Sequence, residues 1–497
     1  MTALNEAKSF AGKLRELCLK EIQKNPDSGL KLACVYGNFI RGNHIGIYSD
    51  LQFEHQVYRQ IKKIIAPNRG ERNSKKSKGV LHLMTTPLEA GGHTRVVERL
   101  CFEGFGEGVA FLDAIPASVS DALPRTTFRH PCLRKRSGIE TINNIVSVSL
   151  HYELVILHIH PEDIYSAIAA VKLTEIGVNV YLYNHADHEF SFGHYGADHV
   201  LEISKYGWNK GRQRGIHEKQ SFAGIPITTK KQISIENAGN FIGVLAGSAT
   251  KFTPWREFNV VDFLNNLFCN DLVRLTGVTI YVVGPSGIES YWKELSGLAR
   301  ENIRFLGSIP HPDYLALLRA SSFYLDSFPQ GNGTGFAEAI QIGLPAFGLD
   351  LLSGSSIADS HRLSTLDELQ IAVKQFLVNS NFDKVQLDYT RRQIEYFQST
   401  KACIRRIQSL SQTGSQVALP DALSSMKCIE NFWELYWLDR KKINFNFLFF
   451  DELNIKAKLS IIGIAISTLS LKHITRILII SHTIYYSKKL VSLFRRL

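Results

Sequence analysis

Short apolar segments alternate with helical stretches along most of this chain, in two successive series. Several of these segments are followed by Gly, Ser or Asp, which is typical of the loops that follow parallel strands and face a ligand. Such alternation predicts two α/β domains in tandem, each built on an open and mostly parallel sheet. The expected strands are 79–84, 109–115, 153–160, 178–185 and 199–204 in the first series, and 241–247, 278–285, 303–309, 321–328 and 345–349 in the second.

The chain outside these two series has a different composition. A basic, polar run without large apolar side chains follows an N-terminal stretch with helical periodicity, which predicts a linker after a helical region. The expected division is a helical region at 1–68, a linker at 69–78, a first α/β domain at 79–232, a second at 233–415 and a helical tail at 416–497.

The formal net charge of +11 indicates an anionic partner, which can be a phosphorylated substrate, an acidic lipid or nucleic acid. No zinc-finger spacing or RNA-binding aromatic signature accompanies the charge, so nucleic acid is not an expected partner.

The seven cysteines are scattered and include no C-x-x-C pair. This pattern favours reduced thiols in a cytoplasmic protein, and the N-terminal residues lack the pattern of a secretory signal.

The last 45 residues are basic and apolar. No acidic residue follows Glu452, while eight Lys and Arg residues lie among dense Ile and Leu. The uninterrupted apolar run at 459–471 is too short to span a bilayer. Two alternatives remain. The tail is either an amphipathic segment in the interface of an anionic membrane, which places the protein on the inner face of that membrane, or a helical pair packed on the protein body.

A glycine-rich loop follows the expected strand that ends at Asp326. It contains Asn332, Gly333, Thr334 and Gly335, and the helix that follows contains Glu338. Glycines let backbone N–H groups approach an anion closely, and a helix N-terminus adds its dipole. The sequence therefore predicts a diphosphate site here, with Glu338 accepting hydrogen bonds from a ribose; a plain tight turn is the alternative.

The pattern Gly-Thr-Gly-Phe-x-Glu-Ala-x-x-x-Gly-Leu-Pro in this region resembles the donor-binding signature of GT-B glycosyltransferases. The Gly-Asn-Gly-Thr-Gly loop is similar to that of O-linked N-acetylglucosamine transferases, and the region is also similar to glycosyltransferase group 1 donor-binding domains. The resemblance implies two facing Rossmann-like domains, with residues 386–410 crossing back to the first. The common retaining pattern has two glutamates eight residues apart, and the position of the first is assigned to Gly331 here, which argues against a retaining mechanism.

The resemblance implies a UDP- or GDP-type nucleotide sugar as co-substrate, with no cofactor and no metal. Lys251, in the loop with Ser248 after the first strand of the second series, is predicted to neutralise the departing diphosphate, because negative charge builds on the leaving oxygen. Backbone groups from Gly307 to Ile309 are predicted to contact the base ring, although the Pro-rich loop there can be only a turn.

In the first domain, a loop with Gly91, Gly92 and His93 resembles the acceptor-side loop of the family. The resemblance implies that His93 positions the acceptor or the sugar. The alternative is a solvated His93 beside a capping Thr94. Arg214 is a weaker candidate for adding positive potential to the cleft.

A cluster of polar residues follows the strand at 178–185. Clusters of His and Asp at the carboxyl edge of a sheet suit acid–base chemistry. Such clusters also suit metal binding, but the resemblance to metal-independent enzymes favours a base. The candidates for the catalytic base are Asp187, His188 and His185, with Asp187 or His188 first, and strand-end hydrogen bonding is the alternative role.

The expected enzyme is a hexosyl- or hexosaminyltransferase that moves a sugar to a glycan, lipid-linked or protein acceptor, in surface polysaccharide synthesis. Two other functions remain open: a sugar-nucleotide epimerase of the same fold, and a non-catalytic scaffold that binds a nucleotide sugar or glycan.

Overall fold

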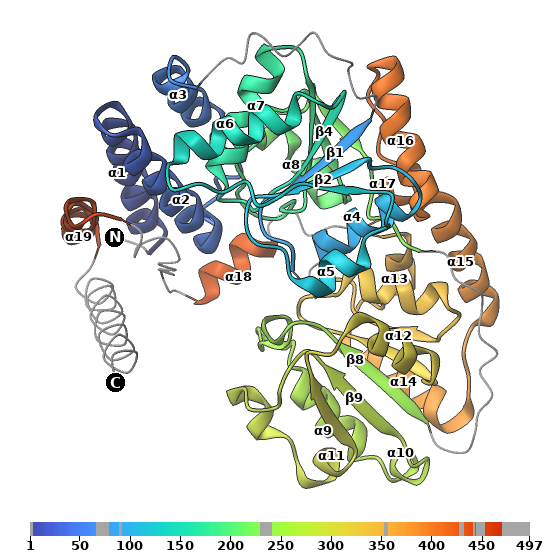
Figure 1. Cartoon of the computed structure of the whole chain (residues 1–497). Helices are drawn as coiled ribbons and strands as arrows, with labels where there is room; N and C mark the ends of the chain where they lie inside the picture. The colour runs from blue at the N-terminus through green and yellow to red at the C-terminus, as the bar shows by residue number, and fades with distance from the viewer. Residues whose placement is uncertain are drawn as a thin grey trace, which may run out of the picture.

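The computed structural model describes residues 3–65, 79–88, 92–228, 241–351, 356–426, 432–440, 443 and 453–469. In this part of the chain, two α/β domains lie against each other, and a layer of N-terminal helices covers the first domain (Figure 1). The linker expected at 69–78 lies outside the described residues.

The first domain is built on a seven-stranded sheet in the order β3-β2-β1-β4-β5-β6-β7, with all neighbours parallel. Its strands are β1 (Val80–Met84), β2 (Gly108–Phe111), β3 (Phe128–Arg129), β4 (Leu154–His158), β5 (Asn179–Tyr183), β6 (His199–Glu202) and β7 (Gln220–Phe222). Its helices are α4 (Gly92–Phe102), α5 (Ala117–Ala122), α6 (Gly138–Ser149), α7 (Ile164–Glu175) and α8 (Lys205–Arg214). The strand order reverses at β1, and ligands of open α/β sheets bind beside such a reversal, outside the carboxyl ends of the strands.

The second domain has a five-stranded parallel sheet in the order β10-β9-β8-β11-β12, which reverses at β8. Its strands are β8 (Ile242–Ala246), β9 (Thr279–Val283), β10 (Ile303–Gly307), β11 (Phe323–Asp326) and β12 (Ala346–Phe347). Its helices are η1 (Ala249–Phe252), α9 (Val260–Phe268), α10 (Asp271–Leu275), η2 (Ser290–Glu294), α11 (Gly297–Glu301), α12 (His311–Arg319), α13 (Gly333–Gln341), η3 (Ile357–His361) and α14 (Leu366–Asn379).

All ten strands that the alternation predicts are present, and β3 and β7 are additional. Apart from 79–84, the predicted strands extend past the observed ends, because the residues that follow belong to loops at the carboxyl edge. The central strands of both sheets are almost fully buried, which agrees with their continuous apolar runs.

Two long helices connect the domains. The helix α15 (Lys384–Gln398) packs its Leu387 and Ile394 on the second sheet with α13, and α16 (Thr400–Thr413) packs Ile404 and Ile407 on the first sheet. The chain therefore returns to the first domain at Ser399, which forms a parallel bridge with Ile227. Figure 1 shows the two helices running along one side of both domains.

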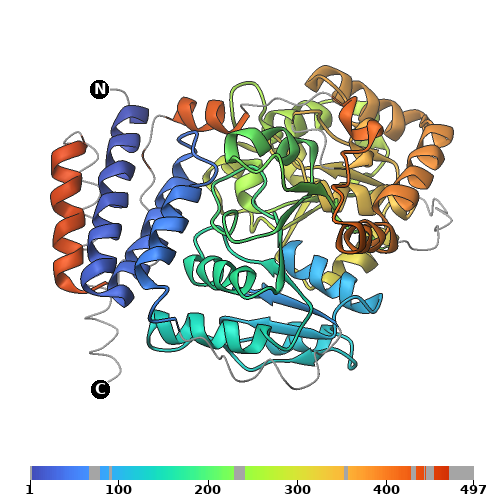
Figure 2. The ribbon, with the colours of Figure 1, turned by 90° about the horizontal axis from the view of Figure 1, so that it is seen from above.

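The N-terminal helices are α1 (Ala3–Lys24), α2 (Pro26–Asn43) and α3 (Leu51–Ile61), and they share a core with one face of the first sheet. The helices α17 (Asp421–Ser424), α18 (Phe432–Arg440) and α19 (Ile455–Thr468) follow the connecting pair. Figures 1 and 2 show α19 beside α1, and its buried residues join the same core. Among the described helices, none has the length and apolar content that crossing a bilayer requires.

Candidate functional site

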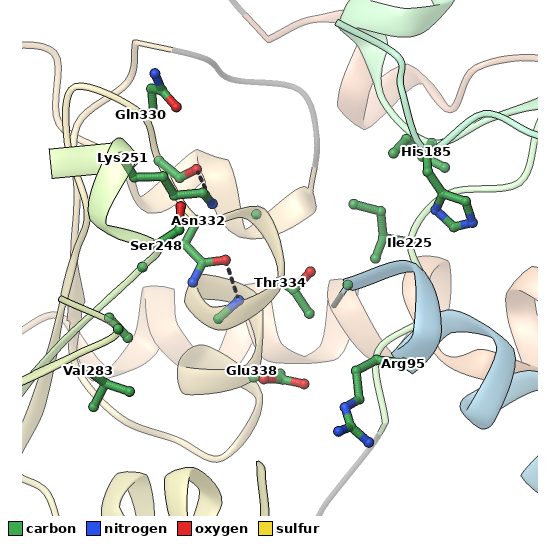
Figure 3. Close-up of a pocket in the computed structure, with 18 of the residues that line it drawn as sticks. Arg95, His185, Ile225, Ser248, Lys251, Val283, Gln330, Asn332, Thr334 and Glu338 are labelled. Carbon is green, nitrogen blue, oxygen red and sulfur yellow. Dashed lines mark hydrogen bonds between the residues drawn. The ribbon is translucent and has the colours of Figure 1, made fainter. Parts of the chain in front are cut away.

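A cavity of about 750 Å³ lies between the two domains, at the carboxyl ends of both sheets. Ligand sites of this kind have volumes of about 300–1,000 Å³. The loops after β8, β9 and β11 form one wall, and α4 with the loops after β5 and β6 forms the other (Figure 3). The cavity thus joins the strand-order reversal of the second sheet to the facing edge of the first.

Most of the predicted site residues line this one cavity. They are Gly92, His185, Asp187, His188, Ser248, Lys251, Ile309, Asn332, Gly333, Thr334, Gly335 and Glu338. Of the other predicted residues, His93, Gly307 and Arg214 are not part of the lining, and Gly91 lies outside the described residues. Segments that are far apart in sequence therefore meet as a single site.

The N-terminus of α13 faces the cavity because its cap holds it there. The Asn332 side chain accepts a hydrogen bond from the Gly335 amide at 3.2 Å, and the Asn332 amide donates to both carboxylate oxygens of Asp326 at 3.0 and 3.1 Å. A Cβ at position 335 lies 2.7 Å from the side-chain nitrogen Nδ2 of Asn332, so any larger residue there displaces the capping side chain. The result is a fixed helix N-terminus, which attracts anions.

Asp326 is itself held by a buried ion-pair network. The Arg362 guanidinium donates to Asp326 and to Asp359, the latter at 2.7 Å, and it lies over the Phe336 ring at 4.3 Å. Burial raises the pKa of Asp326, and the nearby Arg362 opposes that rise. This network connects the glycine-rich loop to the body of the second domain.

Lys251, on η1, reaches the same loop from the end of β8. Its Nζ donates to the Gly331 carbonyl at 3.2 Å, and its backbone carbonyl accepts from the Gln330 amide at 3.3 Å. Burial lowers the pKa of Lys251, while Asp326 nearby opposes this shift. Ser248 lies before η1, and its hydroxyl is 3.0 Å from that of Thr250. The cation and the start of α13 therefore share one crevice (Figure 3).

Glu338 is in an unexpected environment, because Arg99 of the first domain forms an ion pair with it. A second guanidinium nitrogen of Arg99 donates to the Pro226 carbonyl at 2.6 Å, and His311 Nε2 lies 3.8 Å from Glu338 Oε1. The carboxylate that the sequence assigns to a ribose therefore also connects the two domains.

Gly307 and Ile309 have different roles, because Gly307 joins two loops and Ile309 lines the cavity. The Gly307 carbonyl accepts a hydrogen bond from the Gly284 amide at 2.8 Å, which joins the loops after β9 and β10. Ile309 lines the cavity. In Gly284, φ is +108° and an added Cβ lies 1.9 Å from the Gly247 carbonyl oxygen, so this wall depends on glycine.

Asp187 and His188 form a hydrogen-bonded pair after β5. His188 Nδ1 lies 2.9 Å from Asp187 Oδ1, and the Ser204 hydroxyl donates to the other carboxylate oxygen. Burial acts to lower the pKa of His188, but the hydrogen bond to Asp187 and the negative charges of Glu189 and Asp187 together outweigh it, and the pKa is raised. Arg214 is buried behind this loop and donates to the Asp187 carbonyl at 2.5 Å, so it holds the loop and does not line the cavity.

His185 and His93 lie on the same side of the cavity. Burial lowers the pKa of His185 well below its usual range, and its Nε2 lies 2.8 Å from His158 Nδ1. The His93 ring bonds the Thr86 carbonyl at 3.0 Å, while the buried Thr94 hydroxyl accepts from the Leu88 amide. His93 therefore stabilises the loop after β1.

Several lining residues carry no local signal in the sequence. Arg99 and His311 belong to the Glu338 environment, and Trp433 of α18 packs on His188 with ring centroids 4.7 Å apart. Gln330 also lines the cavity, and the assignment of the first glutamate position of the retaining pattern to Gly331 is wrong by one residue, because Gln330 stands eight residues before Glu338. In the part of the chain that the structure describes, no group of three or more His, Cys, Asp or Glu residues is arranged to hold a metal ion.

No family model matches the chain, and no curated protein matches its sequence. Solved structures match its fold. Anabaena Alr3699/HepE in complex with UDP matches at TM-score 0.50 and 15% identity, over 67% of this chain and 100% of that one. A glycosyltransferase from Rickettsia africae ESF-5 matches at TM-score 0.50 and 11% identity, over 67% of this chain and 98% of that one. A Thermobaculum terrenum O-GlcNAc transferase mutant matches at TM-score 0.44 and 13% identity, over 87% of this chain and 82% of that one.

The first two of these matches, together with the two facing parallel sheets, confirm the fold that the sequence predicts. The chain is an α/β protein with the GT-B architecture of two facing Rossmann-like domains, to which N-terminal helices and C-terminal helices are added.

Proposed function

We propose that this protein is a glycosyltransferase that uses a nucleoside-diphosphate sugar as donor. One observation carries the proposal: the Lys251 ammonium and the capped N-terminus of α13 lie on the same wall of the interdomain cavity. A fixed cation beside oriented backbone amides is suited to a diphosphate, both when it binds and when it leaves with extra negative charge.

The second domain holds the donor in this proposal. The amides at the start of α13 bind the diphosphate, Lys251 neutralises the departing oxygen, and Glu338 accepts hydrogen bonds from the ribose. The loop at Ile309 contacts the base. The Anabaena structure holds UDP, which supports the choice of UDP sugars as the first donors to test.

The first domain presents the acceptor across the cavity. A hydroxyl of a glycan, a lipid-linked sugar or a protein attacks the donor sugar, and His185, Asp187 or His188 receives its proton. Asp187 already accepts hydrogen bonds from His188 and Ser204. His185 bonds only His158 through its ring within the described part of the chain, so it is the best placed of the three to accept a new hydrogen bond.

Release of nucleoside diphosphate tests the proposal. The protein is incubated with UDP-glucose, UDP-N-acetylglucosamine and GDP-mannose, with and without glycan acceptors, and free UDP or GDP is measured. We expect release from one donor, and its loss in Lys251→Met. Lys293→Met is the matched control, because Lys293 is exposed in the same domain. Binding without release in any mixture supports a non-catalytic scaffold, and sugar interconversion without release supports an epimerase.

We further propose that the protein acts at an anionic membrane, in polysaccharide synthesis. One face of α19 packs on α1, while Ile455, Leu459 and Ile466 on another face are 73%, 61% and 60% exposed. The chain from Asn454 onward contains eight basic residues and no acidic one. An exposed apolar stripe with basic neighbours is suited to the interface of an acidic bilayer.

Sedimentation with vesicles tests the membrane proposal. We expect binding to phosphatidylglycerol vesicles, weaker binding to phosphatidylcholine vesicles, and loss of binding when Leu459 and Ile466 are both replaced by Ser. Equal recovery of the wild type and this variant with acidic vesicles contradicts the proposal.

A further inference from the structure

Three histidines of the first domain form one continuous chain of hydrogen bonds that ends at the cavity. His82 on β1, His158 at the end of β4 and His185 after β5 lie on adjacent strands of the sheet. His82 Nε2 lies 2.7 Å from the Phe105 carbonyl oxygen, and His82 Nδ1 lies 3.0 Å from His158 Nε2. His158 Nδ1 lies 2.8 Å from His185 Nε2. His82 and His158 are completely buried, whereas His185 lines the cavity.

The position of each proton follows from the buried end of the hydrogen-bonded series, where His82 meets the Phe105 carbonyl. A carbonyl oxygen can only accept, so His82 Nε2 carries the proton that bonds Phe105. A neutral imidazole has one N–H, so His82 Nδ1 is an acceptor and receives the N–H of His158 Nε2. The same step repeats at His158 Nδ1, which accepts from His185 Nε2. The proton of His185 therefore sits on Nε2, and its Nδ1 is unprotonated.

This proton order holds while all three rings are neutral, and the surroundings keep them neutral. Burial lowers the pKa of His82 to about 4 and the pKa values of His158 and His185 well below their usual range. Protonation of His82 or of His158 reverses the last bond, and either one places a charge in a fully buried position beside another imidazole. Such a charge costs several kcal/mol when no carboxylate compensates it.

The neighbouring Tyr183 fixes the planes of the rings. Its ring stacks on His158 at 5.2 Å and on His185 at 5.0 Å between centroids, with interplanar angles of 23° and 17°. Its hydroxyl donates to the Gly224 carbonyl at 2.5 Å. The tyrosine is thus held by its own hydrogen bond and in turn restricts rotation of His185.

We propose that His82 and His158 are positioning residues that hold His185 in the tautomer with an unprotonated Nδ1, so that His185 offers a hydrogen-bond acceptor to a substrate hydroxyl in the cavity. The choice of a hydroxyl rests on the proposed glycosyl transfer, because both the donor sugar and the acceptor are rich in hydroxyl groups. The tautomer itself rests on the hydrogen bonds of the protein alone.

Nuclear magnetic resonance tests the tautomer without any substrate. The protein is labelled with nitrogen-labelled histidine, and the two-bond proton–nitrogen correlations of His185 are assigned from their absence in His185→Gln. We expect Nε2 protonated and Nδ1 unprotonated in the wild type. A protonated Nδ1 in the wild type overturns the proposal.

Substitution of His158 tests whether its hydrogen bonds fix the tautomer of His185. In His158→Gln, the amide can donate to His82 and accept from His185, so the His185 tautomer is expected to persist. In His158→Leu, neither bond forms, and His185 is expected to populate both tautomers. His151→Leu is the control, because His151 is an exposed histidine of the same domain. Equal His185 spectra in the Leu and Gln variants contradict the proposal.

The affinities for UDP-glucose and for UDP test whether His185 accepts a hydrogen bond from a substrate hydroxyl. Loss of one neutral hydrogen bond predicts about 3- to 10-fold weaker binding of UDP-glucose in His158→Leu, unchanged binding of UDP, and recovery in His158→Gln. Unchanged UDP-glucose affinity with slower UDP release assigns the hydroxyl to the accepting side, whereas no change in either contradicts the proposal. If no nucleotide sugar binds the wild type, the proposed function and the hydroxyl fail together, while the spectra still decide the tautomer.

Discussion

Replacing Lys251 by Met removes the one positive charge that η1 brings to the crevice at the start of α13. The ammonium bonds the Gly331 carbonyl, so it occupies the space beside the loop where the proposal puts the diphosphate. A unit charge about 4 Å from a phosphate oxygen contributes about 4 kcal/mol at an effective dielectric constant of about 20. Because this interaction grows as negative charge develops on the leaving oxygen, most of the loss is expected in kcat, by a factor of about 10²–10³.

The assay follows UDP release under saturating donor, and calorimetry measures UDP affinity in parallel. Lys251→Arg keeps a charge and is expected to retain most of the rate. The Met variant loses only one hydrogen bond to the loop, so its melting temperature is expected to stay close to that of the wild type. A kcat within threefold of the wild type at an unchanged melting temperature refutes the assignment of Lys251 to the leaving group.

Three further outcomes follow from the structure. Gly284→Ala places a Cβ against the Gly247 carbonyl, so it is expected to lower the melting temperature and weaken UDP binding, whereas Gly297→Ala, which meets open space, is not. Asp326→Asn removes one of the two buried carboxylates that pair with Arg362, and because Asp359 remains, it is expected to cost less than the about 3 kcal/mol of unfolding free energy that a fully unpaired buried charge costs, as measured in denaturant titrations. Burial lowers the pKa of His82 to about 4 and of His194 to about 3. Each ring therefore stabilises the fold fully above about pH 6.5 and progressively less below it, with about 2 kcal/mol lost per ring by pH 5. Equal denaturation midpoints at pH 7 and pH 5 contradict this last expectation.

The strands and the second-domain wall of the cavity were predictable because their determinants are local. A buried parallel strand needs only a short apolar run, and the Asp326–Glu338 segment contains the strand end, the loop, the cap and the helix in consecutive residues. The two strands that were missed, β3 and β7, have two and three residues, which is too short for a periodic signal.

The facing wall was less predictable because its contacts join distant segments. Arg99 and Glu338 are 239 positions apart, and the sequence around each residue does not indicate that the two form an ion pair. The hydrogen-bonded histidines stand on three strands, so their order in space follows from the strand order of the sheet and not from their spacing in sequence. The tail is divided: α19 packs on the N-terminal helices, as one of the two alternatives expects, while residues 470–497 lie outside the described part of the chain.

If Glu338 binds the ribose as proposed, its pairing with Arg99 links nucleotide binding to the position of the domains. Arg99 is carried by α4 of the first domain, and Glu338 by α13 of the second. If ribose hydroxyls displaced the Arg99 guanidinium, the largely buried Glu338 carboxylate would lose a charged donor and gain only a neutral one. Unpairing a buried charge in this way costs several kcal/mol. Binding that keeps the ion pair and adds the ribose to it is therefore favoured. In that case a bound nucleotide stabilises the domain arrangement in which Arg99 contacts Glu338, and by reciprocity that arrangement binds the nucleotide more tightly.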